Sequence, residues 1–83
     1  MTSIKLKPIA SNMTLLDTPD NLILFSYQTP VASYDKNSLE YYRTAHKWSM
    51  TTTRHINKWL DGANAIEQPQ DYFDNLFNGV EGV

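Results

Sequence analysis

The most regular hydrophobic pattern in this chain predicts an amphipathic α-helix over residues 50–61. Its apolar positions share the spacing of one helix face and are Ile56, Trp59, Leu60 and Ala63. Ser49 or Thr51 is a suitable N-cap, because a hydroxyl oxygen there accepts a hydrogen bond from a backbone N–H of the first turn. Gly62 stands where a helix commonly ends in a left-handed conformation. We therefore expect Trp59 to face the core and the polar side of the helix to face solvent.

Three segments before this helix have the composition of β-strands. Asn21–Tyr27 is apolar on both faces, which is typical of a central strand covered on both sides, or of one covered by a long terminus. Val31–Tyr34 and Leu39–Thr44 flank the polar residues 35–38, which suit a hairpin loop. The sequence therefore predicts an antiparallel meander of three strands.

The N-terminal residues offer a candidate fourth strand. Ile4–Lys7 alternates between apolar and polar residues, as a half-buried strand does. We expect Pro8 to end this strand or to confine it to a sheet edge, because proline lacks the N–H that a central strand needs. Met13–Leu16 fits a short strand and a helical turn equally well, and the pattern does not separate the two.

A shorter second helix is predicted over Gln70–Asn78. Pro69 suits the start of a helix, where its fixed φ is helical and its missing N–H costs nothing. The apolar stripe of this helix is Tyr72, Phe73, Leu76 and Phe77. We expect residues 64–68 to form a linker, Gly79 to stop the helix and residues 80–83 to fray.

Together these elements predict one α+β domain over residues 1–83, in which a small antiparallel meander of three to four strands is packed by one amphipathic helix and a shorter C-terminal helix. The hydrophobic content of 41% is sufficient for a folded core. The chain has no cysteine, which excludes disulfides, thiolate metal ligands and cysteine nucleophiles. It has neither a signal-peptide pattern nor an apolar run of about 18 residues. We therefore expect a cytoplasmic protein that does not enter a membrane.

Charge is distributed unevenly along the chain, although the formal net charge is only −2. Residues 41–60 contain no acid, and their basic side chains are Arg43, His46, Lys47, Arg54, His55 and Lys58. Residues 61–83 contain no Lys or Arg, and their acids are Asp61, Glu67, Asp71, Asp74 and Glu81. The favoured interpretation is that these two segments pack together and neutralise each other. The alternative is that residues 43–58 form a basic surface that binds nucleic acid or an acidic protein.

The start of the predicted helix is the sharpest candidate for a binding site. Free N–H groups, hydroxyls and cations at a helix N-terminus suit a phosphate or a carboxylate. The candidate partner- or anion-binding residues are Arg43, Lys47, Thr51, Arg54, His55 and Lys58. The simpler interpretation, which we favour, is a capped helix start whose Arg54 pairs with Glu40 or with a C-terminal acid.

The aromatic residues carry a second hypothesis about binding. Trp48 and Trp59 are favoured as packing residues over platforms for base stacking. Tyr34, Tyr41 and Tyr42 alternate on the predicted hairpin. If the sheet face opposite the helices is open, these tyrosines form an exposed aromatic patch, which monomers seldom carry without a partner.

The sequence contains no recognisable set of catalytic or metal-binding residues. Its two histidines, His46 and His55, have no regularly spaced carboxylates beside them, so no metal site is expected. A Gly-x-Ser-x-Gly elbow and a glycine-rich phosphate loop are both absent. Asp71 and Asp74 are most simply charges near the start of the second helix. We therefore expect a protein that is not an enzyme and that carries no cofactor.

Three motifs carry a resemblance to a known family. They are FSYQTPVA at residues 25–32, YRT at residues 42–44 and KWSMTTTRHINKWL at residues 47–60. In these motifs the chain resembles a family of small proteins of unknown function found in bacteriophages and mobile elements. The likeness covers residues 22–60 and extends weakly to Phe77. It implies a shared unit of a β-hairpin and a helix, and it transfers no functional residues.

The expected function is that of a small non-enzymatic phage accessory protein that binds and modulates a host macromolecule, with a host protein as the favoured partner. Nucleic-acid binding through residues 43–58 is the first alternative, and it predicts binding that weakens with salt and with the replacement of Arg54 and Lys58 by Ala. A structural homo-oligomer that uses the sheet edge or the tyrosines is the second alternative. If the chain is phage-encoded, its compartment is the host cytoplasm.

Overall fold

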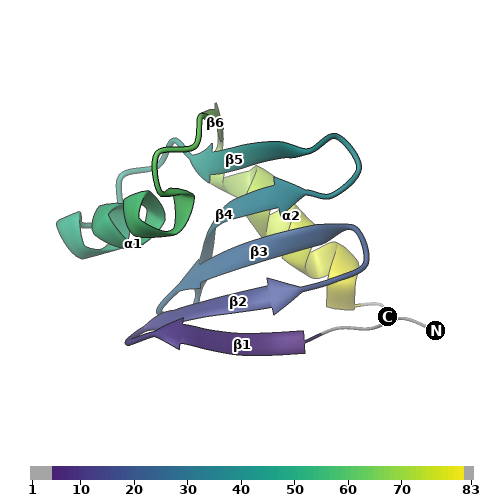
Figure 1. The fold of residues 1–83 in the computed structure, drawn as a ribbon, viewed down its shortest axis with the longest axis horizontal. Coiled ribbons are helices and arrows are strands. Elements are labelled where there is room, and N and C mark those ends of the chain that lie inside the picture. Colours follow the sequence, from purple (N-terminus) through teal and green to yellow (C-terminus); the bar gives the residue numbers. More distant parts are fainter. Residues whose placement is uncertain (1–4, 82–83) are drawn as a thin grey trace.

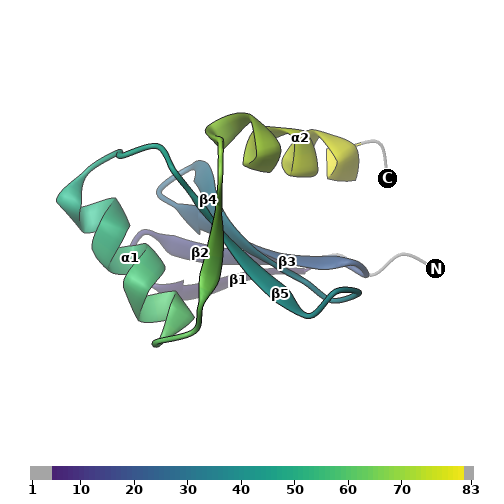
Figure 2. The same cartoon turned by 90° about the horizontal axis from the view of Figure 1, so that it is seen from above.

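Six strands form one mixed sheet with a helix on each face in the computed structural model, which describes residues 5–81 (Figure 1). The elements are β1 (Lys5–Ala10), β2 (Met13–Asp17), β3 (Asn21–Ser26), β4 (Thr29–Asp35), β5 (Glu40–Thr44), α1 (Met50–Leu60), β6 (Ala65–Gln68) and α2 (Gln70–Glu81). The strands lie in sequence order across the sheet; β1 to β5 are antiparallel, whereas β6 runs parallel to β5. Helix α2 lies along one face, and α1 lies against the other face toward one end of the strands (Figure 2).

The predicted antiparallel meander of three to four strands is wrong, although the α+β class holds. Two strands lie outside that prediction: β2, whose residues fitted a strand and a helical turn equally well, and β6, because Ala65–Gln68 was expected to lie in a linker. The side chains of β6 are half-buried or exposed, so no hydrophobic alternation marks it. Its position is set by backbone pairing with β5 after the α1 crossover, in the register Tyr41↔Ala65 to Thr44↔Gln68. A parallel partner of this kind needs a crossover connection, and α1 provides it.

The N-terminal residues form a full hairpin. Strand β1 continues through Pro8 to Ala10, with a register shift between these two residues, so the expectation that Pro8 ends the strand is wrong. The second expectation for Pro8, an edge position, is confirmed, because β1 is one of the two edge strands of the sheet. Met13–Asp17 is a strand and not a helical turn.

Strand β3 is buried on both faces, as its apolar composition predicts. Ile23 and Phe25 belong to a cluster with Leu76 of α2. Leu24 belongs to the opposite cluster, with Ile56 of α1. Ile23 and Leu24 both have no solvent exposure. Successive β3 residues therefore join the sheet to different helices.

Helix α1 begins and ends close to the predicted residues. Ser49 is its N-cap, with a side chain that accepts a hydrogen bond from the N–H of Thr52 at 3.1 Å. Ile56 and Leu60 are buried in the cluster on this face of the sheet, and the half-buried Trp59 packs against it. The left-handed turn that ends the helix is shared by Asp61 and Gly62, whose φ values are 49° and 85°.

Helix α2 begins after Pro69 and is longer than predicted. Phe73 is fully buried and Leu76 packs on the cluster of β2 and β3 residues, whereas the side chain of Phe77 lies outside the described residues. The helix continues to Glu81, so the expected stop at Gly79 is wrong. The expected fraying of residues 80–83 is wrong for residues 80 and 81, and residues 82 and 83 lie outside the described residues. One glycine costs a helix only about 1 kcal/mol relative to alanine, which does not end it. No helix in the described part of the chain is long and apolar enough to span a membrane.

The packing of α1 predicts a large difference between two isoleucine truncations. Ile56→Ala removes a side chain that is 3% exposed and should lower the free energy of unfolding by about 2–5 kcal/mol. Ile66→Ala removes one that is 46% exposed and should cost about 0.5 kcal/mol or less. Urea denaturation followed by circular dichroism measures both. Equal losses would contradict the placement of α1 on the sheet.

Candidate functional site

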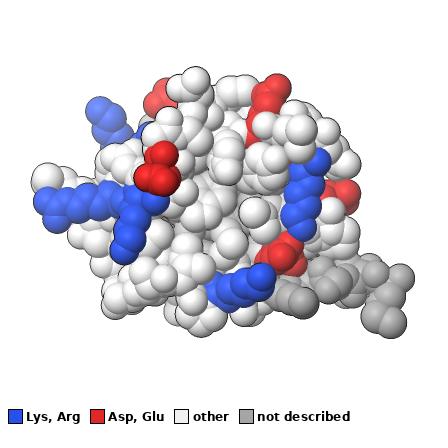
Figure 3. Space-filling model, in the orientation of Figure 1, with Lys and Arg blue, Asp and Glu red and all other residues white. Residues whose placement is uncertain are grey.

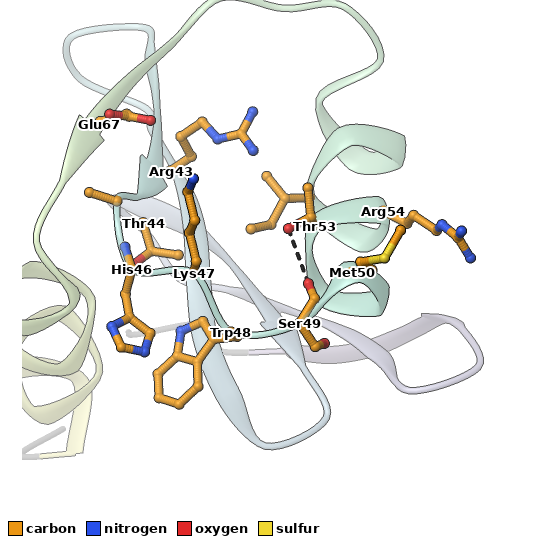
Figure 4. Close-up of a pocket in the computed structure, with 12 residues that line it drawn as sticks. Arg43, Thr44, His46, Lys47, Trp48, Ser49, Met50, Thr53, Arg54 and Glu67 are labelled. Atoms are coloured by element: carbon orange, nitrogen blue, oxygen red, sulfur yellow. Dashed lines mark hydrogen bonds between the residues drawn. The ribbon is translucent and has the colours of Figure 1, made fainter.

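A pocket of about 510 Å³ lies where β5 ends and α1 begins (Figure 4). Residues 43–50 form much of its lining, Thr53, Arg54 and Ile56 contribute from α1, and Glu67 contributes from β6. The position follows from the β5–α1–β6 crossover, which brings the carboxyl ends of two parallel strands together beside a helix start. Ligands of open α/β sheets commonly bind at such carboxyl ends. The pocket is therefore the leading candidate site.

The helix side of the pocket is fixed by the residues that cap α1. Ser49 accepts the N–H of Thr52 through its side chain, and its backbone oxygen accepts the hydroxyl of Thr53 at 3.1 Å (Figure 4). These bonds hold the first turn in place. Thr51 is exposed and does not line the pocket.

Two cations reach the pocket from the strand side. Arg43 donates from Nη1 to Oδ1 of Asn57 at 3.1 Å, which orients the guanidinium toward α1 (Figure 4). This bond uses one of the five N–H donors of the guanidinium. Lys47 extends between β5 and α1, whereas Arg54 points away from the pocket on its outer side (Figure 4). The pocket is therefore cationic where β5 faces α1.

The indole of Trp48 is held by Gln70, the first residue of α2. Oε1 of Gln70 accepts from Nε1 of Trp48 at 3.0 Å and from the hydroxyl of Thr44 at 2.9 Å. Nε2 of Gln70 donates to the backbone oxygen of Pro30 at 2.7 Å. The amide orientation is fixed chemically, because an indole N–H can only donate and a carbonyl can only accept. Trp48 is nevertheless 47% exposed, and the centroid of the His46 ring lies 4.3 Å from the centroid of the indole.

His55 belongs to the contact between α1 and the sheet and not to this pocket. Its Nδ1 lies 2.7 Å from the hydroxyl of Ser26, which also lies 3.1 Å from the hydroxyl of Thr52. A smaller pocket of about 190 Å³ lies beside these hydroxyls and shares Trp48 as a lining residue. Ser26 is only 2% exposed, and its hydroxyl joins strand β3 to helix α1 through His55.

The six predicted binding residues therefore separate into three groups. Arg43, Lys47 and Arg54 line the pocket. Thr51 and Lys58 are exposed on α1 outside the pocket, and His55 packs against Ser26. Sequence reasoning missed Met50, and it took Trp48 as a packing residue. One feature of the sequence could have identified Trp48 as a residue of the site. It stands directly before the N-cap of α1, and the start of a helix is commonly accessible to solvent.

The basic and acidic segments do not neutralise each other through ion pairs in the described part of the chain. Both ion pairs seen there use Asp17, with Lys36 at 2.6 Å and Lys7 at 3.9 Å. No acid within the described residues lies within ion-pair distance of Arg43, Lys47 or Arg54, so the predicted pairing of Arg54 with Glu40 or a C-terminal acid is not found there. Figure 3 shows several Lys and Arg side chains, with an acidic side chain beside them, at the end of the molecule that α1 occupies in Figure 1, and further Lys or Arg side chains elsewhere on this face.

The three tyrosines of the hairpin do not form one exposed patch. The rings of Tyr34 and Tyr41 pack together, with their centroids 4.6 Å apart, and Tyr41 packs edge-on against Trp59 of α1. Tyr42 packs with Tyr72 of α2 at 5.3 Å. Each face of the sheet carries a helix, so the condition for an open tyrosine face is not met.

The described residues contain no group of three or more His, Asp or Glu that could hold a metal ion. Among the described residues, Tyr72 has a pKa that is raised above its usual value of 10.0. Burial is the main cause, followed by the proximity of Tyr42 and Asp35. This tyrosine lies on the α2 face and therefore reports on packing, not on the pocket.

Comparison with known proteins finds one family. The model of a family of unknown function, DUF8033, matches residues 4–75. No curated protein and no solved structure matches the chain.

The hydrogen bonds of Gln70 predict that its replacement loosens Trp48. In Gln70→Leu the indole N–H loses its acceptor, and its exchange with solvent should become about tenfold faster, as expected for one net hydrogen bond. The indole N–H signal in NMR spectra measures this rate. Gln28→Leu, at an exposed turn, is the matched control and should leave the rate unchanged. Equal rates in all three proteins would contradict the assigned bond.

The raised pKa of Tyr72 predicts a specific loss of stability in alkali. The folded protein holds the phenol proton of Tyr72 more tightly than the unfolded chain does. The stability that this proton contributes is therefore complete below about pH 10, and it is lost as the pH rises through the pKa of the folded state. Tyr72→Phe should therefore lose less stability than the wild type between neutral and alkaline pH. Tyr27→Phe, at an exposed tyrosine, should follow the wild type. Thermal unfolding across this range tests the difference, and identical slopes for Tyr72→Phe and wild type would refute it.

Proposed function

We propose that this chain, which belongs to the family of unknown function DUF8033, is a non-enzymatic binding protein that engages another protein through the pocket between β5 and α1. The observation that carries the proposal is the exposure of Trp48 and Met50, at 47% and 74%, on the lining of one pocket. Aromatic residues, Met and Arg are enriched in protein interfaces, and Trp is among the commonest binding hot spots.

The setting of Trp48 supports a binding role over a packing role. Gln70 holds this indole in place, while 47% of its surface stays accessible to a partner. A group that is already ordered loses little conformational entropy when a partner covers it. The arrangement is therefore suited to recognition.

We further propose that the chain originates from a bacteriophage or mobile element and modulates a protein of the host. The support is the resemblance carried by the motifs at residues 25–32 and 47–60, together with the small size of the chain. The partner is then a cytoplasmic host protein, and binding is the means by which its activity is altered.

Nucleic-acid binding is the second candidate, and one observation favours it. The ring centroids of His46 and Trp48 lie 4.3 Å apart, beside Lys47. Proteins that bind single-stranded nucleic acid combine such aromatic rings, on which bases stack, with cations that contact phosphates. This function requires affinity that falls steeply with salt and falls further when Arg54 and Lys58 become Ala.

Site-specific photo-cross-linking tests these functions together. A benzophenone side chain replaces Met50 at the pocket or, as control, Leu39, which is similarly exposed at 68% in the loop between β4 and β5. After irradiation in bacterial lysate, the Met50 position should yield a discrete protein adduct that the Leu39 position does not. Mass spectrometry identifies each adduct.

Each result has a definite meaning. A discrete protein adduct at Met50 that Trp48→Ala abolishes supports the proposal. Adducts that are identical at both positions, or absent at Met50, would overturn it. A nucleic-acid adduct at Met50 assigns the surface to the second candidate, and an adduct with another copy of the chain assigns it to self-assembly.

A further inference from the structure

We infer that the pocket between β5 and α1 binds a short acidic segment of the partner, with one large apolar side chain between Trp48 and Met50 and with carboxylates at Arg43 and Lys47. The inference rests on the proposed function and adds the chemistry of the bound segment. Three features of the pocket support it, namely its unpaired cations, its fixed aromatic wall and the acids that surround it.

The cations determine the charge of the occupant. Arg43 and Lys47 line the pocket, and neither forms an ion pair with an acid in the described part of the chain. Asn57 holds the guanidinium of Arg43 by one hydrogen bond, which leaves further donors that can meet a carboxylate. Charge-assisted hydrogen bonds of this type are roughly twice as strong as neutral ones.

The apolar lining determines the second component. Trp48 is fixed by Gln70, whereas Met50 is 74% exposed and has a flexible side chain that adapts to different shapes. The volume of about 510 Å³ lies in the range of pockets that bury a drug-sized ligand, so it accommodates one large side chain and part of its backbone. An aliphatic or aromatic residue next to the acids therefore suits this space.

The surrounding acids limit the length of an anionic occupant. Glu67 lines the pocket, and Asp74 accepts a hydrogen bond from Nε2 of Gln70, the residue that holds Trp48. Beyond the pocket a continuous polyanion would meet these carboxylates, and the whole chain carries a formal net charge of −2. A short acidic stretch satisfies Arg43 and Lys47 without this repulsion. A peptide segment therefore suits the pocket better than a nucleic-acid strand does.

Selection from a random library tests this chemistry directly. A yeast-displayed library of random ten-residue peptides is sorted against the full chain, and recovered peptides should be enriched in Asp or Glu beside a large apolar residue. A fluorescein-labelled copy of the most enriched peptide then serves as the probe for fluorescence anisotropy. Lys47→Gln should weaken its binding about tenfold, as expected for loss of one charge-assisted hydrogen bond.

The matched control is Lys7→Gln, which removes the same charge from an exposed side chain on β1. This variant should bind the peptide as the wild type does, and circular dichroism confirms that both variants are folded. Trp48→Phe, which keeps a ring but loses the bond to Gln70, should also weaken binding.

The inference fails if no acidic peptides are enriched, or if Lys47→Gln and Lys7→Gln affect binding equally. It also fails if a ten-nucleotide oligothymidylate binds more tightly than the peptide and displaces it. A protein adduct at Met50 combined with such a failure leaves the proposed function in place and removes only the acidic segment.

Discussion

The structure depends on the burial of both faces of its sheet. Ile23 and Leu24 are adjacent in β3, have no solvent exposure and belong to hydrophobic clusters on opposite faces. A chain of this length buries only about 60% of its unfolded surface, so neither cluster is dispensable. Helix α1 completes one cluster through Ile56 and Leu60, and α2 lies over the other (Figure 2). Both helices are therefore needed for the fold.

This two-sided arrangement also produces the candidate site. The chain between β5 and α1 leaves the sheet and enters the helix layer, and Ser49 fixes its end by capping α1. Gln70 fixes it from the opposite layer, because this first residue of α2 bonds Thr44 and Trp48. The segment is consequently ordered while its side chains remain accessible. An aromatic residue held by Gln70 and the cations Arg43 and Lys47 thus meet in one pocket as a result of how the two helix layers are joined.

Local signals in the sequence predicted the elements that local physics determines. The helical spacing of Ile56 and Leu60, together with the hydroxyl of Ser49, was sufficient to predict helix α1. The apolar composition of β3 was sufficient to predict a central strand. Strand β6 was missed because backbone pairing with β5 positions it, and side-chain alternation does not mark it. The role of Gln70 was also missed, since its bond to Pro30 spans 40 residues. Arg43, Lys47 and Arg54 line the pocket because they stand near the end of β5 and the start of α1, two elements that the sequence predicted.

Methyl NOE spectroscopy tests the two-sided burial most directly. With labelled isoleucine, leucine and valine methyl groups, the Ile56 methyls should show contacts to Leu24 and Val31, whereas the Ile23 methyls should show contacts to Leu16 and Leu76. No contact should connect Ile56 with Leu76, because the sheet separates them. Contacts between Ile56 and Leu76, or an Ile56 side chain without contacts to β3 and β4, would contradict the account.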